Sequence, residues 1–436
     1  MMHTIDLRGL QLNRAELLAL APRSLTDVSA ASAVAKELIA DVRARGAQAL
    51  LDQAERLDGI RPQRVRLDAA QISSAVRGLS APVRDALEEA IVRVRAASEA
   101  QLPTERVTQL APGAEVIQRW SPVNRVGLYV PGGKAVYPSS VVMNAIPAQV
   151  AGVSSVALAS PAQKQFNGEI HPTILGAAGL LGIDEVYAMG GAGAIGAFAY
   201  GVPDLSLDPV QVITGPGNIY VAAAKRLVRG QVGIDAEAGP TEILVIADAS
   251  ADAFLVASDL ISQAEHDELA AAVLVTDSVE LADRVQVELQ RLSALTPHRT
   301  RVEIALRGIQ SAVVLVDSLA SAAAFSNVYG PEHLEIQTAD PGEMLDLIES
   351  AGAIFLGPNS PVSLGDYLAG SNHVLPTGGQ ARFTPGLGAY TFLRPQQVIR
   401  YNSAALKEIE AKIVALATAE DLPAHAAAIT ARFLPG

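Results

Sequence analysis

Short apolar runs alternate with longer amphipathic segments along most of the chain, which predicts strands and helices in turn. Residues 241–247 (Thr-Glu-Ile-Leu-Val-Ile-Ala) form the clearest apolar run, and its continuity is typical of a strand covered on both faces. The next segment, 253–266, repeats apolar residues at the spacing of one helix face. Strands that alternate with helices pair in parallel, so the pattern predicts an α/β fold.

The predicted elements form two series, separated by a break at 230–240. The first series has strands at 125–130, 155–159, 185–189 and 211–214, with helices at 141–150, 174–181, 192–200 and 219–228. The second series has strands at 241–247, 272–276, 312–316, 334–337 and 353–356, with helices between them. Two long helical patterns, 31–57 and 82–100, precede both series. We therefore expect two Rossmann-like parallel-sheet units.

The two ends of the chain lack this alternation. Residues 1–25 are weakly patterned and are expected to form an N-terminal arm. Residues 386–436 show one helical pattern and no sheet pattern, so this C-terminal tail should dock on another body, such as a second subunit. The expected domains between them are 26–125 together with 241–385, and 126–240.

Composition narrows the class of protein. The chain has 436 residues, of which 50% are hydrophobic but only 4% aromatic, so Ala, Val, Leu and Ile must build the cores. The net charge of −13 argues against a nucleic-acid or anionic-membrane partner. The absence of cysteine excludes disulfides, thiolate metal sites and a cysteine nucleophile. We also see neither a signal peptide nor a membrane span, and we expect a cytoplasmic protein.

Three loops follow predicted strands and open predicted helices. The run Gly191–Gly196 matches the dinucleotide fingerprint G-x-G-x-x-G, with Asp208 roughly where an acidic ribose partner would fall. However, the chain is rich in Gly and Ala, so a chance match is the alternative. The loops at 129–133 and 215–218 would place backbone N–H groups where a pyrophosphate is stabilised. Ordinary turn chemistry is the alternative for both.

Polar residues in the second half of the chain suggest chemistry. Gln263 and His266 are three residues apart, so they are neighbours on a helix surface and can converge on a metal ion. The alternative is a polar helix end with a solvated histidine, since two ligands do not make a site. Glu332 and His333 place a carboxylate beside an imidazole, which suits proton transfer, unless they form an ordinary surface loop.

Seven runs, taken together and in order, resemble the histidinol dehydrogenase family. They are 126–133 (Val-Gly-Leu-Tyr-Val-Pro-Gly-Gly), 215–218 (Gly-Pro-Gly-Asn), 238–242 (Ala-Gly-Pro-Thr-Glu), 262–266 (Ser-Gln-Ala-Glu-His), 329–333 (Tyr-Gly-Pro-Glu-His), 370–377 (Gly-Ser-Asn-His-Val-Leu-Pro-Thr) and 420–425 (Glu-Asp-Leu-Pro-Ala-His). They extend over nearly the whole chain, so the signal is strong although each run alone is weak.

The resemblance implies an intertwined homodimer with shared active sites and one zinc ion per subunit. The implied metal ligands are Gln263, His266, Asp366 and, from the partner subunit, His425. Together with His333, these four ligands are also implied to contact the substrate, L-histidinol. Further implied substrate contacts are Thr241, His373 and Glu420, and the implied NAD contacts are Tyr129 and Asn218.

The implied reaction is the last step of histidine biosynthesis. L-histidinol is oxidised to L-histidine through L-histidinaldehyde, and two hydrides pass to NAD⁺. His333 would take the hydroxyl proton, and Glu332 would activate the water that hydrates the aldehyde. A hydrated aldehyde loses hydride without forming a thioester, which fits a chain that has no cysteine. The first domain would then carry the metal and acid/base residues, and the second would face NAD.

The chain also departs from the family pattern. The family usually has Gln at position 193 and Ala at position 196, so the fingerprint is interpreted as an accident, and the NAD contact expected from a Gln side chain is missing. Thr241 replaces a usual Ser and keeps the hydroxyl, while Asp267 and Glu268 replace Gly-Pro. A zinc hydrolase that uses Glu332 as its base, or a non-catalytic metal- or nucleotide-binding protein, would be the rival functions.

Overall fold

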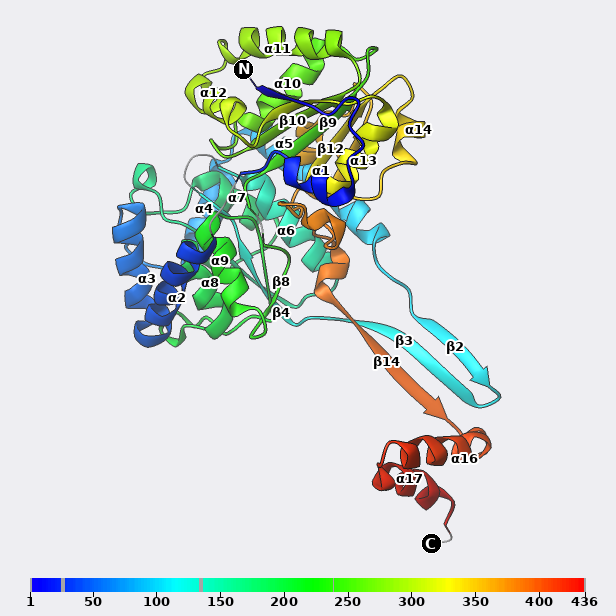
Figure 1. The fold of residues 1–436 in the computed structure, drawn as a ribbon. Coiled ribbons are helices and arrows are strands. Elements are labelled where there is room, and N and C mark those ends of the chain that lie inside the picture. The colour runs from blue at the N-terminus through cyan, green and yellow to red at the C-terminus, as the bar shows by residue number, and fades with distance from the viewer. Residues whose placement is uncertain (1, 25–27, 133–135, 238, 435–436) are drawn as a thin grey trace. The chain divides into compact units, whose positions relative to one another are not determined.

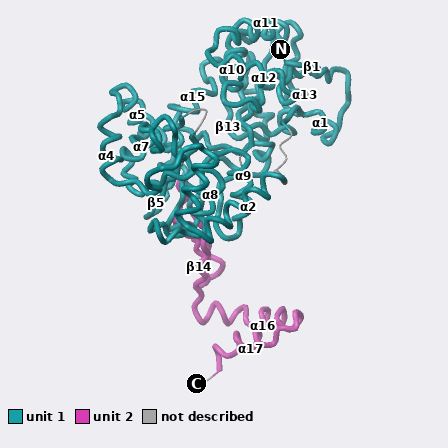
Figure 2. The backbone as a smooth tube through the Cα atoms, turned by 90° about the vertical axis from the view of Figure 1, so that its left-hand side faces the viewer, with its two compact units in different colours: residues 1–101, 123–392 teal, residues 102–122, 393–436 magenta. Residues whose placement is uncertain are grey.

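The computed structural model describes residues 2–24, 28–132, 136–237 and 239–434. Gly133 and Ala238, which belong to two of the runs above, lie outside the described residues. The chain forms two compact units (Figure 2): residues 1–101 with 123–392, and residues 102–122 with 393–436.

A six-stranded parallel sheet lies in the first unit, in the order β1-β11-β10-β9-β12-β13 (Figure 1). The strands are β1 (His3–Asp6), β9 (Glu242–Ala247), β10 (Ala271–Thr276), β11 (Ala312–Leu315), β12 (His333–Gln337) and β13 (Ala353–Leu356). One face packs on α10 (Ala253–Ala264), α11 (Val279–Ser293) and α12 (Arg299–Arg307). The other face packs on α1 (Arg14–Leu20), α13 (Leu319–Tyr329) and α14 (Pro341–Leu345). β9 is buried throughout, as its apolar run predicts.

A five-stranded parallel sheet in the same unit has the order β6-β5-β4-β7-β8. Its strands are β4 (Arg125–Tyr129), β5 (Ser155–Ser160), β6 (Val186–Ala188), β7 (Val212–Thr214) and β8 (Gly233–Ile234). α8 (Gly191–Tyr200) and α9 (Ile219–Val228) share a core with α2 (Val28–Arg45) and α3 (Ala47–Gln53). α6 (Pro138–Val150) and α7 (Pro172–Leu180) contact α5 (Ala81–Ala100) and α4 (Ala69–Gly78) respectively.

Shorter elements complete the first unit. They are a π-helix at Ala54–Asp58, α15 (Val362–Tyr367), and single 3₁₀ turns at Lys164–Phe166, Pro203–Leu205, Gln380–Arg382 and Ala389–Phe392. The pattern expected as one helix over 31–57 is interrupted at Gly46, whose φ of +56° is a left-handed conformation that a helix cannot continue through.

The predicted α/β fold with two parallel sheets is confirmed, but the grouping of the segments differs from the expectation. The N-terminal arm adds an edge strand, β1, to the six-stranded sheet. The helices of residues 28–100, expected to join residues 241–385, instead pack on the five-stranded sheet. The reason is the small apolar face of α2, where Ala31, Ala35 and Ile39 meet the core of that sheet.

The second unit corrects the expectation that the C-terminal tail has no sheet. β14 (Leu393–Tyr401) pairs antiparallel with β3 (Ala114–Pro122), which pairs with β2 (Arg106–Ala111). Residues 102–122 therefore belong with the tail rather than with the first α/β domain. Two helices follow rather than the single one expected, α16 (Ser403–Ala419) and α17 (Pro423–Thr430), before a 3₁₀ turn at Ala431–Phe433. Because β14 is almost entirely exposed, it carries no alternation that would reveal a strand.

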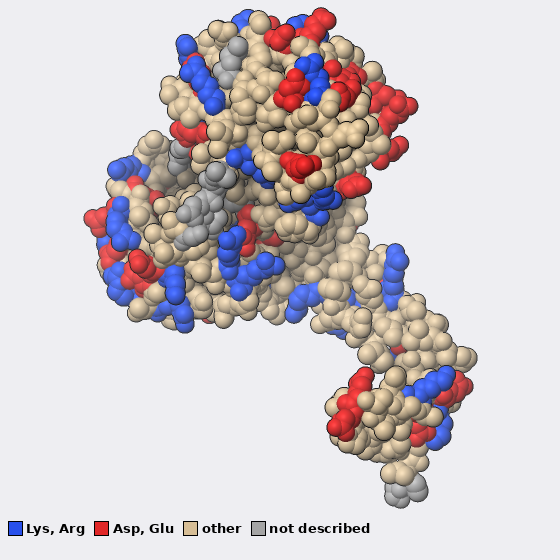
Figure 3. Space-filling view, in the orientation of Figure 1, with Lys and Arg blue, Asp and Glu red and all other residues tan. Residues whose placement is uncertain are grey.

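The distribution of charged side chains and the polarity of the helices bear on two expectations from the sequence. Acidic and basic side chains are mixed over the face drawn in Figure 3, and the described residues form no continuous basic area there. Within the described ranges, each helix is either too short or too polar to span a bilayer.

Candidate active site

A cavity of about 800 Å³ lies between the two sheets of the first unit. Its lining includes Glu242 and His333, the first residues of β9 and β12. It also includes Gly132 and Gly217 from the loops that follow β4 and β7. The carboxyl edge of the five-stranded sheet thus faces the amino edge of the six-stranded sheet. Since β4 lies between β5 and β7, the loops after β4 and β7 stand at the strand-order reversal where α/β sheets bind ligands.

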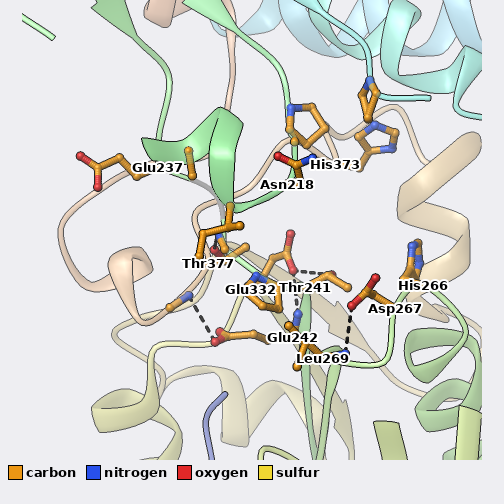
Figure 4. A pocket seen from close by; sticks show the side chains of 18 of the residues that line it. Asn218, Glu237, Thr241, Glu242, His266, Asp267, Leu269, Glu332, His373 and Thr377 are labelled. Carbon is orange, nitrogen blue, oxygen red and sulfur yellow. Dashed lines mark hydrogen bonds between the residues drawn. The ribbon is translucent and has the colours of Figure 1, made fainter. Parts of the chain in front are cut away.

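Glu332 lies at the floor of this cavity, immediately before β12. α13 ends at Tyr329, and the left-handed φ of +57° at the next residue, Gly330, turns the chain so that Glu332 enters the sheet edge. Glu332 Oε2 accepts hydrogen bonds from the Thr241 hydroxyl at 2.6 Å and from the Glu242 N–H at 2.8 Å (Figure 4). Burial, opposed by these two bonds, raises the pKa of Glu332 to about 8. The carboxyl group can therefore gain and lose a proton near neutral pH.

His333 is held in one tautomer. Its Nδ1 lies 3.0 Å from the backbone oxygen of Glu242, a carbonyl that can only accept, so Nδ1 carries the hydrogen. Burial lowers the pKa of His333, against the opposing field of Asp366. The imidazole is therefore neutral at neutral pH, and its Nε2 keeps a lone pair that can accept a proton.

Thr241 links the acid/base pair to α10. Its hydroxyl donates to Glu332 and accepts from Gln263 Nε2 at 2.6 Å. Gln263 is 1% exposed and lies in the last turn of α10, while His266 follows the helix and lines the cavity. The spacing expected from the sequence therefore holds, although the helix ends at Ala264, earlier than predicted.

His266 and Asp366 present metal-ligand atoms to the same cavity. His266 Nε2 lies 4.0 Å from Asp366 Oδ2. Burial lowers the pKa of His266, which favours the neutral imidazole that a metal binds. An imidazole nitrogen and a carboxylate oxygen are ligand types that zinc binds. Gln263, the third predicted ligand of this subunit, lies one helix turn before His266 and donates through Nε2 to Thr241. No cluster of three or more His, Cys, Asp and Glu side chains within the described ranges can hold a metal. This donor set therefore fits zinc but needs a further ligand.

His373 also lines the cavity and is fixed from both ring nitrogens. Its Nδ1 donates to the backbone oxygen of Asp366 at 3.0 Å, and its Nε2 lies 3.0 Å from the Ser140 hydroxyl. With Nδ1 protonated, Nε2 accepts from the hydroxyl. Burial lowers the pKa of His373, so this histidine is a neutral, oriented group rather than a cation.

The two residues expected to contact NAD lie at the carboxyl edge of the five-stranded sheet. Asn218 lines the cavity, and its side chain caps α9 by accepting from Tyr220 and Val221 N–H groups. Tyr129 ends β4 and is buried, and its hydroxyl accepts the Gly191 N–H at 3.1 Å.

The glycines of the fingerprint run have packing roles. A Cβ at Gly193 would lie 2.3 Å from Gln53 Oε1, and one at Gly196 would lie 3.2 Å from the Ile39 Cα. Both glycines therefore allow α8 to approach α2 and α3, which gives a packing reason for residues that resemble a phosphate loop. Asp208 is exposed, and its backbone oxygen accepts from Arg125.

The remaining expected residues belong to the second unit. Glu420 follows α16 and His425 lies in α17, and both are exposed. In the first unit, the structure brings together Thr241, Gln263, His266, Glu332, His333, Asp366 and His373. Two further lining residues, Arg23 and Glu242, were not singled out. Arg23 has no sequence signal because it lies within the weakly patterned segment 1–25. Glu242 has none because it belongs to the run 241–247, whose continuous apolar character predicts only a buried strand.

Comparisons with known proteins match nearly the whole chain to histidinol dehydrogenases. The model of the histidinol dehydrogenase family matches residues 21–433. A histidinol dehydrogenase of Leifsonia xyli subsp. xyli is 68% identical over 432 residues, which cover 99% of this chain and 99% of that protein. One from Mycobacterium tuberculosis is 56% identical over 432 residues, with coverages of 98% and 97%. The crystal structure of histidinol dehydrogenase from Elizabethkingia anophelis matches with a TM-score of 0.92 and 31% identity, covering 99% of this chain and 98% of that one.

Proposed function

Because the chain belongs to the histidinol dehydrogenase family, a family of oxidoreductases in histidine biosynthesis, we propose that it oxidises L-histidinol to L-histidine. The reaction passes through L-histidinaldehyde and transfers two hydrides, each to one NAD⁺. The observation that carries this proposal is the pair Glu332–His333 at the cavity floor, in which one group is a neutral base and the other titrates near neutral pH.

His333 serves the hydride-transfer steps. Its Nδ1–H is committed to the Glu242 carbonyl, so its Nε2 accepts the hydroxyl proton while the carbon-bound hydrogen leaves as hydride. The lowered pKa of His333 keeps Nε2 unprotonated before the reaction. In the second oxidation the same nitrogen takes a proton from the hydrated aldehyde.

Glu332 serves the hydration step between the two oxidations. As a carboxylate it removes a proton from the water that adds to the aldehyde carbon. The protonated carboxyl then returns a proton to the former carbonyl oxygen, and the product is a geminal diol. A base with a pKa of about 8 suits this task, because catalysis is most effective when the pKa lies near the working pH. The diol then gives up hydride directly, which is consistent with a chain that lacks cysteine.

Zinc is the proposed resident metal, one ion per subunit. Gln263, His266, Asp366 and the partner subunit's His425 would hold it, and the separation of 4.0 Å between His266 Nε2 and Asp366 Oδ2 supports this assignment. When bound, zinc would anchor the substrate by binding the nitrogen atoms of histidinol, and would orient the substrate for reaction. Thr241 and His373 would contribute further polar contacts to the substrate.

A homodimer with shared sites is part of the same proposal. Among its described residues, the first unit offers too few metal ligands of its own, which leaves room for the partner subunit's His425. The partner's Glu420 would reach the substrate in the same way. The second unit also exposes large apolar side chains, with Leu416 at 66% and Leu434 at 69% exposure. Such side chains are suited to burial against another chain. NAD would bind at the carboxyl edge of the five-stranded sheet, beside Asn218 and Tyr129.

The test is spectrophotometric. Zinc-loaded protein is mixed with L-histidinol and NAD⁺, and the absorbance of NADH is followed together with the formation of histidine. We expect two NADH for each histidine. A zinc hydrolase or a binding protein would produce no NADH, so its absence from folded, zinc-loaded protein would refute the proposal.

A further inference from the structure

The main chain of Glu242 holds both members of the acid/base pair. Its N–H donates to Glu332 Oε2 at 2.8 Å, and its carbonyl oxygen accepts from His333 Nδ1 at 3.0 Å. The ladder between β9 and β12 starts one residue later, where Ile243 lies opposite His333. At this end of the ladder, the N–H and the carbonyl of Glu242 both contact side chains of the acid/base pair. A shift of this one residue would misplace both groups at once.

The side chain of Glu242 is buried and tied to the N-terminal segment. Glu242 is 5% exposed, and its Oε1 accepts from Arg23 Nη1 at 3.2 Å and from the Gly378 N–H at 3.2 Å. The Arg23 guanidinium stacks on the Tyr329 ring, with its central carbon 4.0 Å from the ring centroid, and also donates to the Tyr329 carbonyl. Arg23 thus joins the start of β9 to the end of α13, the two segments that carry the acid/base machinery.

We propose that Arg23 and Glu242 are positioning residues of this active site. Their ion pair fixes the main chain of residue 242, and that main chain sets the orientation of Glu332 and the tautomer of His333. The ion pair acts where the loop 239–241 enters β9. The other bonds of this loop are made by Gly239 and Thr241, so Arg23 is the charged partner of residue 242 itself. The catalytic consequence rests on the proposed function, whereas the geometric consequence does not.

A second ion pair of similar burial serves as a control that distinguishes a positioning role from a purely stabilising one. Arg125 and Glu185 pair at the amino end of β4 and the start of β6, away from the cavity lining. Their side chains are 16% and 15% exposed, against 19% and 7% for Arg23 and Glu242. Arg125→Met therefore removes a comparably buried guanidinium that touches neither member of the acid/base pair.

The kinetic experiment compares Arg23→Met with Arg125→Met, both zinc-loaded and corrected for folded fraction. We expect Arg23→Met to lower kcat ~10- to 100-fold, the range for a small misplacement of reacting groups, while KM for histidinol changes less than twofold. Arg125→Met should keep the kcat of the wild type. Glu242→Gln keeps an oxygen that accepts from Arg23 and Gly378, so it should lose less kcat than Glu242→Ala. Because Arg23→Met leaves a buried carboxylate, the double variant Arg23→Met/Glu242→Gln provides the comparison if the single variant does not fold.

A spectroscopic experiment measures the tautomer of His333 without depending on catalytic turnover. In protein labelled with ¹⁵N-histidine, the wild type should show His333 with a protonated Nδ1 and a bare Nε2, assigned by comparison with His333→Gln. In Arg23→Met or the double variant, the His333 signal should shift toward a mixture of tautomers, and in Arg125→Met it should not. If His333 signals and kcat match the wild type in the Arg23 variants, while melting temperatures fall as in Arg125→Met, the ion pair only stabilises the fold and the inference is wrong. If the wild type forms no NADH but the Arg23 variants still show this tautomer shift, the proposed reaction is refuted and the positioning role remains.

Discussion

The buried carboxyl of Glu332 contributes to the pH dependence of the stability of the fold, and Glu332→Gln should remove that contribution. The other buried carboxyls, such as Glu242 and Glu335, are unchanged in this variant. The Gln side chain keeps an oxygen that accepts from the Thr241 hydroxyl and the Glu242 N–H, so the local geometry is retained. What it loses is the charge. In the wild type, burial holds the pKa of Glu332 at about 8 instead of the ordinary 4.5, so the folded state resists ionisation.

The sign and size follow from proton linkage. A pKa raised in the folded state gives a contribution that is fully present below about pH 4.5 and is lost as pH rises through about 8. One pKa unit corresponds to ~1.4 kcal/mol, so the free energy of unfolding should fall by on the order of 5 kcal/mol across this window. With an unfolding entropy of ~2.1 cal/mol/K per residue, a first unit of this size should lose roughly 6 °C in melting temperature.

The assay is thermal unfolding of metal-free protein at pH 5, 7 and 9, since a bound metal would add its own linkage. Wild type, Glu332→Gln and the exposed-site control Glu99→Gln are compared. The advantage of Glu332→Gln over the wild type should widen with each step in pH, while Glu99→Gln should follow the wild type. If the melting temperatures of Glu332→Gln and wild type fall in parallel from pH 5 to pH 9, Glu332 ionises as an ordinary carboxyl and the reasoning fails.

Four further outcomes are expected. Chelation should abolish histidinol oxidation and zinc should restore it; full turnover by protein shown to be metal-free would contradict the proposed zinc site. Glu332→Gln should slow the aldehyde-to-acid half-reaction by ~10²–10⁴ and the alcohol-to-aldehyde half much less, whereas equal losses would give Glu332 another role. Co-expressed His266→Ala and His425→Ala subunits should recover roughly a quarter of wild-type activity, because about half the dimers are mixed and each has one intact site; inactive heterodimers would refute shared sites. Gly215→Ala should lower the melting temperature far more than Gly230→Ala, although the two glycines have similar φ values of +116° and +103°. A Cβ at Gly215 would lie 1.9 Å from a backbone oxygen, whereas a Cβ at Gly230 would have no neighbour within 4 Å. Equal losses would show that the close approach is relieved.

The elements that could be predicted from sequence are those buried on both faces. β9, β10 and β11 are continuous apolar runs because helices cover each side of their sheet, and the pattern marks them to within a residue or so. The helical pattern expected at 219–228 coincides with α9, which begins directly after Asn218, whose side chain caps it.

Two kinds of element could not be predicted from the sequence. In the first, the partner elements are far away in the chain; in the second, few side chains of the element are buried. β1 is a four-residue edge strand with an exposed pattern, recognisable only once β11 is known to lie beside it. β14 is exposed along almost its whole length, so neither periodicity nor burial marks it. Which sheet the helices at 28–100 cover is decided by packing with α6 to α9, which local pattern does not report.

The candidate site shows the same limit. Glu332 and His333 are adjacent in sequence, so their residue types alone suggest proton transfer. The spacing of Gln263 and His266 suggests a metal, and the resemblance supplies the remaining assigned residues. The contribution of Arg23 depends on its ion pair with Glu242, which is 219 residues away in the sequence, so no local pattern predicts it. The fingerprint glycines show the reverse, because a pattern that suggests a ligand loop is used at Gly193 and Gly196 for helix packing.

The three-stranded sheet of the second unit sets an order of events during synthesis. β2 and β3 leave the ribosome early and can form their hairpin at once, but β14 pairs with β3 only after nearly the entire first unit has been made. Until then one edge of β3 presents unpaired backbone groups, and such edges invite pairing with other chains. The last strand to be translated therefore closes an edge that has been open since the first third of the protein was made. A ribosome stalled before Leu393 would display that edge to every neighbouring nascent chain.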